Sequence, residues 1–511
     1  MVAADTPHMT AIDRNLVYWF GLEPSAAERA EFAQRNLRVE LVKDGATPDF
    51  NLARAAVFCA KPPFVPSACG KLDVVTTALN HGLLVYLLAE DDTTQAHLRS
   101  QVPAAAWSGP LAPHLRARTG EVPSFECAEV IARHQAGPHA KSTLDIHLPP
   151  GVELSPERLF MIRRAFSDCS TVSLEPLSGG RSAAAYAVQA RLVASAVGPR
   201  PLPFFMKLDS PEKIVAEEAR YRDYATLHIP WYLRPNLDPA RCLVGLEQGV
   251  LVGSFVGQSE SLWEAVLDGR GPRYIHALFE ETLMGWRSQA YQHPPRKGRL
   301  ACTLRDTFKW ERVKQEHVGR ASEFGEVRSP QYLWEALLNV PEQTWREAPM
   351  HGDMHAENVR VRNDDAIIID LAKAGMGPLC ADIASLEVWL SFEVPSEPKN
   401  IPNCEAWTAI VREMYAPHNV ARPPNLATTD VGIDWLRACA RQTRMFGGAI
   451  CECNTEYATA IAVHLLRRAC YSLDEGDALY LAEDAYRRAL AYQLGSCLVD
   501  WLATATVTEA A

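Results

Sequence analysis

The chain has 511 residues, of which 48% are hydrophobic and 22% are charged, and its formal net charge at pH 7 is −11. A chain of this length is too long for one hydrophobic core, so we expect two or three domains. The acidic balance argues against non-specific binding to nucleic acid or to an anionic membrane surface, and no apolar run approaches the roughly 18 residues of a membrane-spanning helix.

The beginning of the chain and its cysteines bear on where the protein works. No basic stretch followed by an apolar one opens the sequence, which predicts a cytoplasmic protein without a secretory signal. The thirteen cysteines are scattered without a repeated CxxC spacing, although Cys451 and Cys453 lie two apart. This distribution predicts reduced, mostly buried thiols and argues against a cysteine-based metal site.

From residue 15 to about 135, continuous apolar runs alternate with helical patterns. Such an alternation predicts a small parallel sheet covered by helices on both faces. We expect Ser25 to cap the first helix and Gly82 to close the second. Strands are predicted at 15–22, 37–43, 55–61, 83–90 and 104–109, and helices at 25–36, 71–82, 91–102 and 126–137.

The order of these elements resembles a flavodoxin-like or receiver-like α/β domain, which we place at residues 1–136. A receiver needs acidic residues at its strand ends, and Glu23 is the sole candidate. Glycine-rich phosphate loops are absent from this part of the sequence as well. We therefore expect an interaction or sensing module with a protein partner, and a linker at 137–155.

The remaining chain changes from strands to helices. A helix is predicted at 155–166. Residues 156–257 predict a β-rich lobe, with strands around a Gly-Gly turn, at 201–209 and within 241–257, and a further helix at 210–228 that Ser210 caps. Residues 258–511 are predicted to be largely helical, and they contain the polar segment 351–358, which has the residues of a catalytic loop. A small sheet lobe that leads into a larger helical lobe predicts an α+β bilobal, kinase-like arrangement.

The segment "HGDMHAEN" (351–358) allows three interpretations: a metal cage, a phosphoryl-transfer loop, or a polar turn that happens to be rich in possible ligands. His351, Asp353 and His355 alternate, so on a strand they would share a face, as the ligands of a metallophosphatase can. Such an enzyme would also need an upstream Asp-x-His and a downstream Asn-His-Asp, which the sequence lacks. The metal-dependent phosphatase remains an alternative that predicts phosphoester hydrolysis without ATP.

Phosphoryl transfer is the second interpretation. Asp353 and Asn358 lie five apart on one loop, and Asp370 follows twelve residues later at the end of "AIII". Phosphoryl transfer requires this set: one carboxylate to orient the acceptor and take its proton, and two groups to bind metal. Mg²⁺ prefers hard oxygen ligands, so we expect Asn358 and Asp370 to bind it and Asp353 to serve as the proton acceptor.

"HGDMHAEN", the following "IIID" and "GPLCADIA" resemble the aminoglycoside phosphotransferase and choline kinase superfamily, which has the protein-kinase-like fold. The resemblance implies ATP and Mg²⁺ as cofactors and transfer of the γ-phosphoryl group to a hydroxyl-type acceptor. It also implies that Asp382 is a structural acceptor that braces the catalytic loop. "LSGGRSAAAY", "MKLD" and "EEARYRDYATLHIP" resemble the bacterial ternary-complex-associated domain 9 group, which makes an antibiotic or choline acceptor less expected.

A kinase lobe also needs a strand lysine held by a helix glutamate. Lys207 ends the strand "LPFFMK", and Glu217 and Glu218 follow on the next helix. Either could make the ion pair, and we favour Glu217 because it stands four residues before Tyr221.

The same lobe should contact the nucleotide through two further segments. The turn 178–186 would fold over the phosphates, although alanine stands where a third glycine is usual. A hinge around 249–257 would meet the adenine. The predicted nucleotide-binding residues are Gly179, Gly180, Ser182, Ser254 and Val256.

A binding protein is the rival of the enzyme. A pseudokinase scaffold or nucleotide sensor fits the degenerate glycine turn and the added N-terminal module, whereas a scaffold has no need of Asp353, Asn358 and Asp370 together. The acceptor stays open. A pocket for polycationic aminoglycosides should present several carboxylates, and Glu387, Glu393 and Glu397 are either such groups or surface charge.

Overall fold

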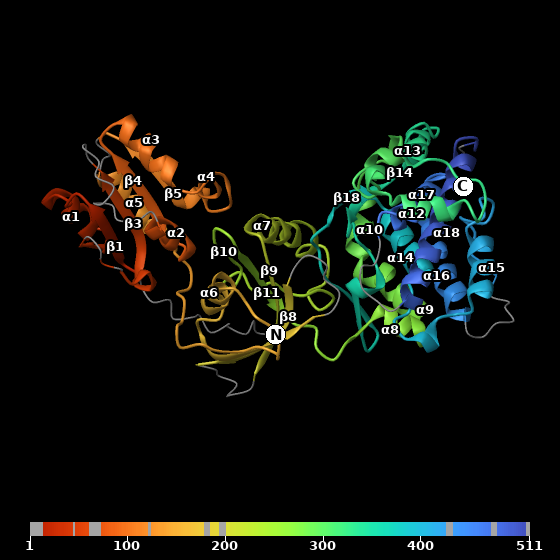
Figure 1. Ribbon diagram of the computed structural model, residues 1–511, viewed down its shortest axis with the longest axis horizontal. Coiled ribbons are helices and arrows are strands. Elements are labelled where there is room, and N and C mark those ends of the chain that lie inside the picture. The colour runs from red at the N-terminus through yellow and green to blue at the C-terminus, as the bar shows by residue number, and fades with distance from the viewer. Residues whose placement is uncertain are drawn as a thin grey trace. The chain divides into compact units, whose positions relative to one another are not determined.

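The computed structural model of the protein (Figure 1) describes residues 14–43, 46, 48–60, 73–120, 124–177, 184–193, 201–425, 433–471 and 478–506. The chain forms two units. Unit 1 comprises Met1–Ala219 with Asn236–Gly257, and unit 2 comprises Arg220–Pro235 with Gln258–Ala511. None of the helices in the described part of the chain is both long and apolar enough to cross a membrane.

Unit 1 begins with a five-stranded sheet in the order β2-β1-β3-β4-β5, and every pair in it is parallel, as the alternating pattern predicts. The helices between the strands cover the sheet. The strands are β1 (Leu16–Gly21), β2 (Arg38–Leu41), β3 (Ala53–Ala60), β4 (Leu84–Ala89) and β5 (Leu115–Thr119), and the main helices are α1 (Ala26–Ala33), α2 (Asp73–Asn80), α3 (Asp92–Gln101) and α5 (Ser124–Arg133).

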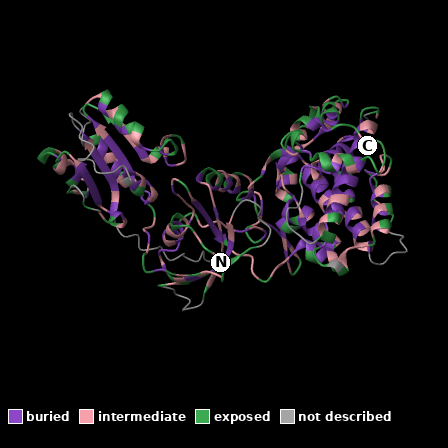
Figure 2. Cartoon of the chain, in the orientation of Figure 1, coloured by how far each residue is buried: buried purple, intermediate pink, exposed green. Residues whose placement is uncertain are grey.

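The two faces of this sheet carry separate cores because successive side chains of a strand point to opposite faces. On β1, Tyr18 faces the core that contains Leu79 of α2, while Trp19 faces the core that contains Phe32 of α1 and Ile131 of α5. β1, β3 and β4 are accordingly buried over most of their length, whereas the edge strands β2 and β5 are more exposed (Figure 2). Ser25 caps α1 in a capping box, as predicted.

The prediction of a strand at 104–109 is wrong. Residues Ala104–Ser108 form the short helix α4, directly after Pro103, and the fifth strand begins only at Leu115. Alanine has the highest helix propensity of any residue type, and three alanines follow one another here. Proline lacks a backbone N–H, but the first turn of a helix does not need that donor, so a helix can begin beside Pro103. The run therefore reads as apolar without being a strand.

The second sheet of unit 1 has six strands in the order β10-β11-β9-β8-β7-β6. The segment 137–155, expected as a linker, contributes β6, which pairs in parallel with β7, and Arg163 donates to the carbonyls of Lys141, Ser142 and Leu144. The strands are β6 (Asp145–His147), β7 (Cys169–Pro176), β8 (Ala184–Leu192), β9 (Leu202–Asp209), β10 (Leu243–Val244) and β11 (Gly249–Ser254), with helices α6 (Pro156–Ala165) and α7 (Pro211–Arg220).

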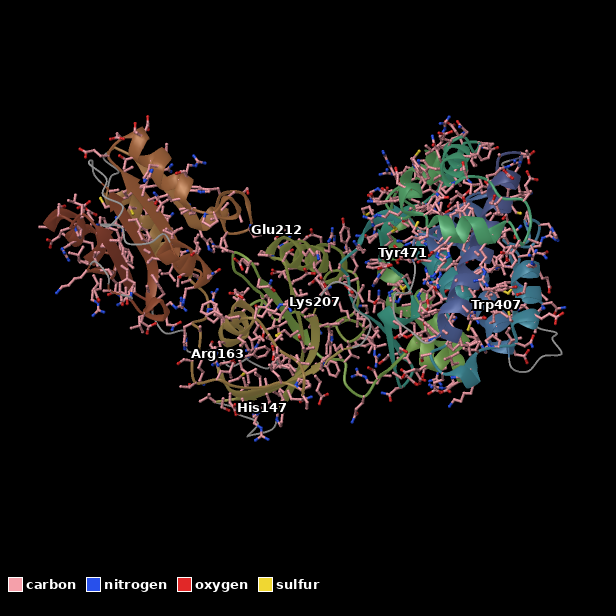
Figure 3. The ribbon with its side chains drawn as sticks, viewed as in Figure 1. His147, Arg163, Lys207, Glu212, Trp407 and Tyr471 are labelled. Atoms are coloured by element: carbon pink, nitrogen blue, oxygen red, sulfur yellow. The ribbon has the colours of Figure 1, made fainter. Side chains whose placement is uncertain are left out.

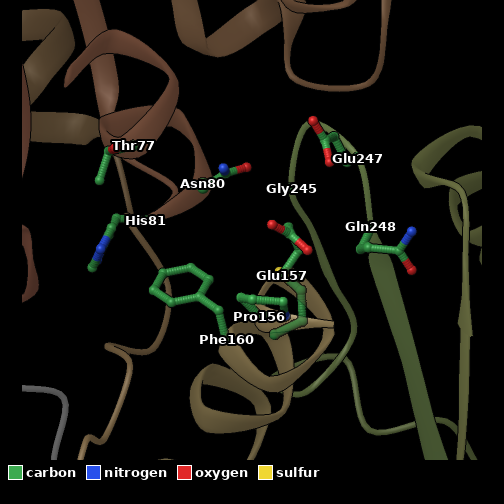
Figure 4. Close-up of a pocket in the computed structure, with 10 residues that line it drawn as sticks. Thr77, Asn80, His81, Pro156, Glu157, Phe160, Gly245, Glu247 and Gln248 are labelled. Carbon is green, nitrogen blue, oxygen red and sulfur yellow. The ribbon is translucent and has the colours of Figure 1, made fainter. Parts of the chain in front are cut away.

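Helix α6 joins the two sheets of unit 1. The buried Arg164 guanidinium donates to the carbonyls of Ala136 and Pro138, at 3.2 and 3.1 Å, and also to that of Asn80 at the end of α2. Beside it, an open cavity of about 260 Å³ lies between the end of α2, helix α6 and the turn before β11 (Figure 4). The five-stranded module is thus attached to the second sheet by buried hydrogen bonds.

Unit 2 is mostly helical, with two small sheets that carry the predicted site. One sheet has the order β12-β16-β17, and the other pairs β15 with β18. These strands are β12 (Glu260–Ser261), β15 (Glu347–Met350), β16 (Val359–Arg362), β17 (Asp365–Ile368) and β18 (Gly375–Pro378). A further pair consists of β13 (Arg296–Gly298) and β14 (Gln343–Trp345).

The helices of unit 2 pack around α14, which is buried on nearly all sides. Helices α16, α17 and α18 pack against it. The helices are α8 (Leu262–Leu267), α9 (Gly271–Ala277), α10 (Met284–Ala290), α11 (Leu300–Thr303), α12 (Gln315–Ala321), α13 (Pro330–Leu338), α14 (Ala381–Phe392), α15 (Cys404–Met414), α16 (Asp434–Ile450), α17 (Glu456–Arg468) and α18 (Ala478–Leu502).

Candidate active site

The loop 351–358 connects β15 to β16, and the side chain of Asp382 binds its first two residues. The two carboxylate oxygens of this buried side chain, in the first turn of α14, accept the backbone N–H groups of His351 at 2.6 Å and Gly352 at 3.0 Å. Gly352 has a φ of +74°, and a Cβ there would lie 2.4 Å from the carbonyl oxygen of Lys373. The brace that the family resemblance implied for Asp382 is therefore present.

A second set of bonds ties this loop to the end of β17. The carbonyl of Ile369 accepts a hydrogen bond from His351 Nε2, at 2.8 Å, and the Ile369 N–H donates to the carbonyl of Asn358, at 2.9 Å. Asp370 is the next residue, and its φ of +57° is uncommon for a residue other than glycine. Such a backbone state, held by its surroundings, is typical of functional sites. These bonds bring Asn358 and Asp370, the two predicted metal ligands, to the same end of the small sheet.

Asn358 is oriented by its own loop. Its side-chain Nδ2 donates to the backbone carbonyl of Asp353, at 3.0 Å, and the residue is 8% exposed. Because the amide nitrogen is committed to the loop, Oδ1 is the atom that remains to bind a cation, and Mg²⁺ prefers such an oxygen. The donor set of Asn358 and Asp370 therefore fits the metal that the sequence predicts.

Asp353 forms an ion pair that the sequence did not reveal. Arg467, at the end of α17, donates from Nη2 to Asp353 Oδ1 at 2.7 Å, with side-chain exposures of 19% for the arginine and 35% for the aspartate. Burial would raise the pKa of Asp353, but the Arg467 guanidinium lowers it below its ordinary value. Asp353 is therefore anionic at neutral pH.

Two histidines near this carboxylate are uncharged. His355 stacks on Trp389, with ring centroids 5.6 Å apart, and burial lowers its pKa to about 4. Burial also lowers the pKa of His464, which lies on α17 one turn before Arg467, to about 3. Arg467 is accordingly the cation that accompanies Asp353, and both histidines have a packing role here.

The predicted strand lysine and its glutamate lie in unit 1. Lys207 Nζ on β9 (Figure 3) is 2.8 Å from Glu217 Oε2 on α7, and both side chains are nearly buried, at 13% and 4% exposure. The ion partner favoured by the sequence, Glu217, is thus in place. Glu218, its neighbour, is half-buried.

The other predicted nucleotide contacts are less defined. Ser254 ends β11, where its N–H donates to the carbonyl of Asn236 at 2.8 Å and its hydroxyl accepts the Asn236 N–H at 2.9 Å. A contact between adenine and the Ser254 N–H would have to replace the first of these bonds. Val256 follows β11 by two residues and stays a prediction, while Gly179, Gly180 and Ser182 lie outside the described residues.

The three carboxylates considered for a cationic acceptor are already paired. Glu387 is 1% exposed and binds Arg444 at 2.7 Å, together with the hydroxyls of Thr443 and Tyr457. Glu393 pairs with Arg468, and Glu397 with the exposed Lys399. Glu387 is thus a core residue and not, as the sequence allowed, a pocket or surface charge.

Comparisons with known proteins agree with this picture of the site. The model of the "Phosphotransferase enzyme family" matches residues 173–401, which include loop 351–358, Asp370 and Asp382. No curated protein matches the chain.

Solved structures give weaker likenesses. A choline/ethanolamine kinase family protein from Mesorhizobium loti is 15% identical, with a TM-score of 0.32, over 65% of this chain and 92% of that one. A choline kinase from Cryptosporidium parvum is 12% identical, with a TM-score of 0.31, over 64% and 90%. An aminoglycoside-3'-phosphotransferase of type VIII is 17% identical, with a TM-score of 0.28, over 52% and 91%. Scores of this size add no argument about the site.

The family match covers the loop 351–358 and the residues that brace it. Residues 173–401 thus match the phosphotransferase enzyme family, in agreement with the resemblance to the aminoglycoside phosphotransferase and choline kinase superfamily that the loop indicated.

Proposed function

We propose that the protein is a cytoplasmic, ATP- and Mg²⁺-dependent kinase that transfers the γ-phosphoryl group to a hydroxyl of a small molecule. The observation that carries this proposal is the placement of Asp353, Asn358 and Asp370 around one loop that Asp382 braces. Phosphoryl transfer asks mainly for positioning and charge neutralisation, which such a rigid loop supplies.

Asp353 is the proposed proton acceptor. Arg467 holds its Oδ1, and within the described residues no hydrogen-bond donor contacts Oδ2. Oδ2 can therefore accept the hydroxyl proton of the acceptor and orient its oxygen for attack. Because the carboxylate is kept anionic, it accepts this hydrogen bond throughout the neutral pH range.

The phosphates of the nucleotide are assigned to two groups of residues. Asn358 and Asp370 would hold Mg²⁺, which when bound neutralises charge on the nucleotide phosphates. Lys207, fixed by Glu217, would bind the α- and β-phosphates, and the pairing keeps its ammonium group in one place. The segment 178–186, Ser254, Val256 and the half-buried Glu218 remain proposed parts of the nucleotide site.

The charges around Asp353 bear on the acceptor. Asp353 and Glu393 are each paired with an arginine of α17, and Glu387 is paired with Arg444. A polycationic acceptor would have to displace these guanidinium groups to gain the carboxylates. This favours an acceptor of low positive charge, in keeping with the resemblance to the ternary-complex-associated domain 9 group.

We propose a flavodoxin-like or receiver-like assignment for the N-terminal module, with a protein as its partner. The strand order β2-β1-β3-β4-β5 in an all-parallel sheet supports this assignment, because it is the doubly wound order of such domains. Arg164 and the other buried contacts at α6 would link a partner on the module to the lobe that contains Lys207.

The test measures ADP release by the full chain with ATP and Mg²⁺ over a panel of hydroxyl compounds of different charge. We expect turnover that one acceptor stimulates and that Asp353→Ala abolishes. Thermal unfolding with ATP and Mg²⁺ is measured on the same samples and on Asp370→Asn. Stabilisation without turnover, over the whole panel, would favour the pseudokinase scaffold, and absence of any stabilisation would contradict nucleotide binding.

A further inference from the structure

Three side chains near the ends of α14, α16 and α17 come together in unit 2. Cys380 directly precedes α14, Cys451 directly follows α16, and Glu456 begins α17. One ligand atom of each, the two Sγ atoms and a carboxylate oxygen, lies within 4.8 Å of the others. Cys380 and Glu456 are fully buried, and Cys451 is half-buried. We call these three residues the thiol cluster.

One oxygen of the Glu456 carboxylate in the thiol cluster lacks a hydrogen-bond partner among the described residues. Glu456 Oε2 accepts the backbone N–H of Glu452 at 2.8 Å, whereas its Oε1 is buried without a hydrogen-bond partner among the described residues. A buried polar atom without a partner costs free energy, on the order of 1–3 kcal/mol. Burial raises the pKa of Glu456 to about 7, although the Glu452 N–H and the two thiols of the cluster act in the opposite direction.

Among the described residues, the other buried cysteines lack this arrangement. Cys439 on α16 is equally buried, and burial alone raises the pKa of its thiol. Nothing about Cys439 goes beyond the packing of a small apolar side chain. In the thiol cluster, by contrast, two sulfur atoms and an unpaired carboxylate oxygen face one another in a buried site. Packing alone does not require that combination.

We propose that Cys380, Cys451 and Glu456 bind a thiophilic divalent cation of the Zn²⁺ type, with two thiolates and one carboxylate as ligands. Thiolates select such cations, whereas the Asn358 and Asp370 oxygens suit Mg²⁺, so the two sites take different metals. Zn²⁺ with three protein ligands completes its tetrahedron with water. Binding breaks both S–H bonds and releases these protons, with that of Glu456 where it is protonated, and no electron is transferred.

The position of the thiol cluster gives the metal a structural consequence. Cys380 stands two residues before Asp382, whose carboxylate holds the N–H groups of His351 and Gly352. A bound cation would fix the start of α14 to the turn between α16 and α17. It would thereby hold the residue that braces the catalytic loop.

The first test uses Co²⁺ as a spectroscopic substitute on the full, reduced, metal-stripped chain. We expect one equivalent to give the sulfur-to-cobalt charge-transfer absorption and the visible bands of a tetrahedral site, and Zn²⁺ to displace it. Zn²⁺ should also raise the unfolding midpoint by several degrees. Cys380→Ser and Cys451→Ser should weaken binding on the order of 100-fold or more, whereas Cys439→Ser, at an equally buried thiol outside the cluster, should bind like wild type.

A second measurement needs no variant and so does not depend on whether a variant folds. One equivalent of Zn²⁺ should slow the alkylation of Cys451, followed by mass spectrometry, and leave the exposed Cys302 unaffected. The proposal is overturned by Co²⁺ spectra without the charge-transfer band, by equal titrations of wild type and Cys380→Ser, or by unchanged alkylation of Cys451.

Discussion

Arg467 holds Asp353 through one carboxylate oxygen only, with 2.7 Å between Nη2 and Oδ1. Two features follow from this geometry. The guanidinium keeps the carboxylate anionic against the effect of burial, and it leaves Oδ2 available to the proposed acceptor. Arg467 is therefore a positioning residue for the proposed proton acceptor, and its removal should change the pH dependence of turnover.

In Arg467→Met, the positive charge that lowers the pKa of Asp353 is removed, while the burial that raises this pKa remains. The pKa of Asp353 should therefore rise above its present, lowered value. Since turnover requires the carboxylate, the acidic limb of the kcat profile should move to higher pH, and kcat should fall by about 10–100-fold. Arg468→Met is the matched control, because the neighbouring Arg468 pairs with Glu393 and not with Asp353. An unshifted acidic limb in Arg467→Met would contradict the assigned role.

Asp353→Asn preserves the shape of the side chain but removes its basicity. General-base catalysis contributes about 10²–10⁴-fold, so we expect kcat to fall by that factor. Stabilisation by ATP with Mg²⁺ in thermal unfolding should persist, because the metal is assigned to Asn358 and Asp370. If the variant kept its turnover, Asp353 could not be the proton acceptor.

Lys207 and Glu217 should behave as a coupled pair. Removing one partner leaves a charge in a nearly buried site, which costs about 3–5 kcal/mol. Lys207→Met and Glu217→Gln should each reduce the free energy of unfolding by that order and also lose ATP-dependent stabilisation, and the double variant should lose less than the sum. Denaturant unfolding with and without ATP measures both effects.

The same two elements of unit 1 contain a control for this cycle. Lys213 on α7 pairs with Asp209 at the end of β9, at 2.9 Å, but its side chain is 57% exposed. Lys213→Met should change the free energy of unfolding by less than about 1 kcal/mol and leave the ATP effect intact. If Lys207→Met and Lys213→Met reduced the free energy of unfolding equally, burial of the Lys207–Glu217 pair would not contribute to stability.

Asp382→Asn should weaken the attachment of loop 351–358 to α14. An amide retains one acceptor oxygen, so one of the N–H groups of His351 and Gly352 loses its partner, at a cost of about 1–3 kcal/mol. We expect lower stability in urea and a reduced kcat, with acceptor KM less affected. Asp306→Asn, whose side chain is fully exposed, should leave both quantities unchanged.

Local patterns were sufficient where the physical cause was itself local. The parallel sheet of the module follows from apolar runs that alternate with helices, and the Lys207–Glu217 pair follows from helical spacing after a strand. The loop 351–358 was readable because its residues act within a few positions of one another. The prediction of a strand at 104–109 was wrong because an apolar run of alanines occurs in helices as well as in strands.

Contacts between distant segments could not be read in this way. Arg467 stands 114 residues after Asp353, and nothing in the helical pattern of 456–468 distinguishes it from Arg468. Cys380 likewise meets Cys451 only because α14 and α16 pack together, so a search for closely spaced cysteines excluded the thiol cluster. Glu387 was predicted to be either a pocket carboxylate or a surface charge, because its partner, Arg444, lies 57 residues away in the sequence.

The guanidinium of Arg164 has a consequence for how the protein can be divided. Its hydrogen-bond acceptors, the carbonyls of Asn80, Ala136 and Pro138, all belong to the N-terminal module or the segment that follows it. A fragment that starts after residue 138 would retain a buried cation without any of these acceptors. The boundary near residue 137 therefore separates two architectures without separating two folding units, and the module and the lobe with Lys207 should melt in one cooperative transition.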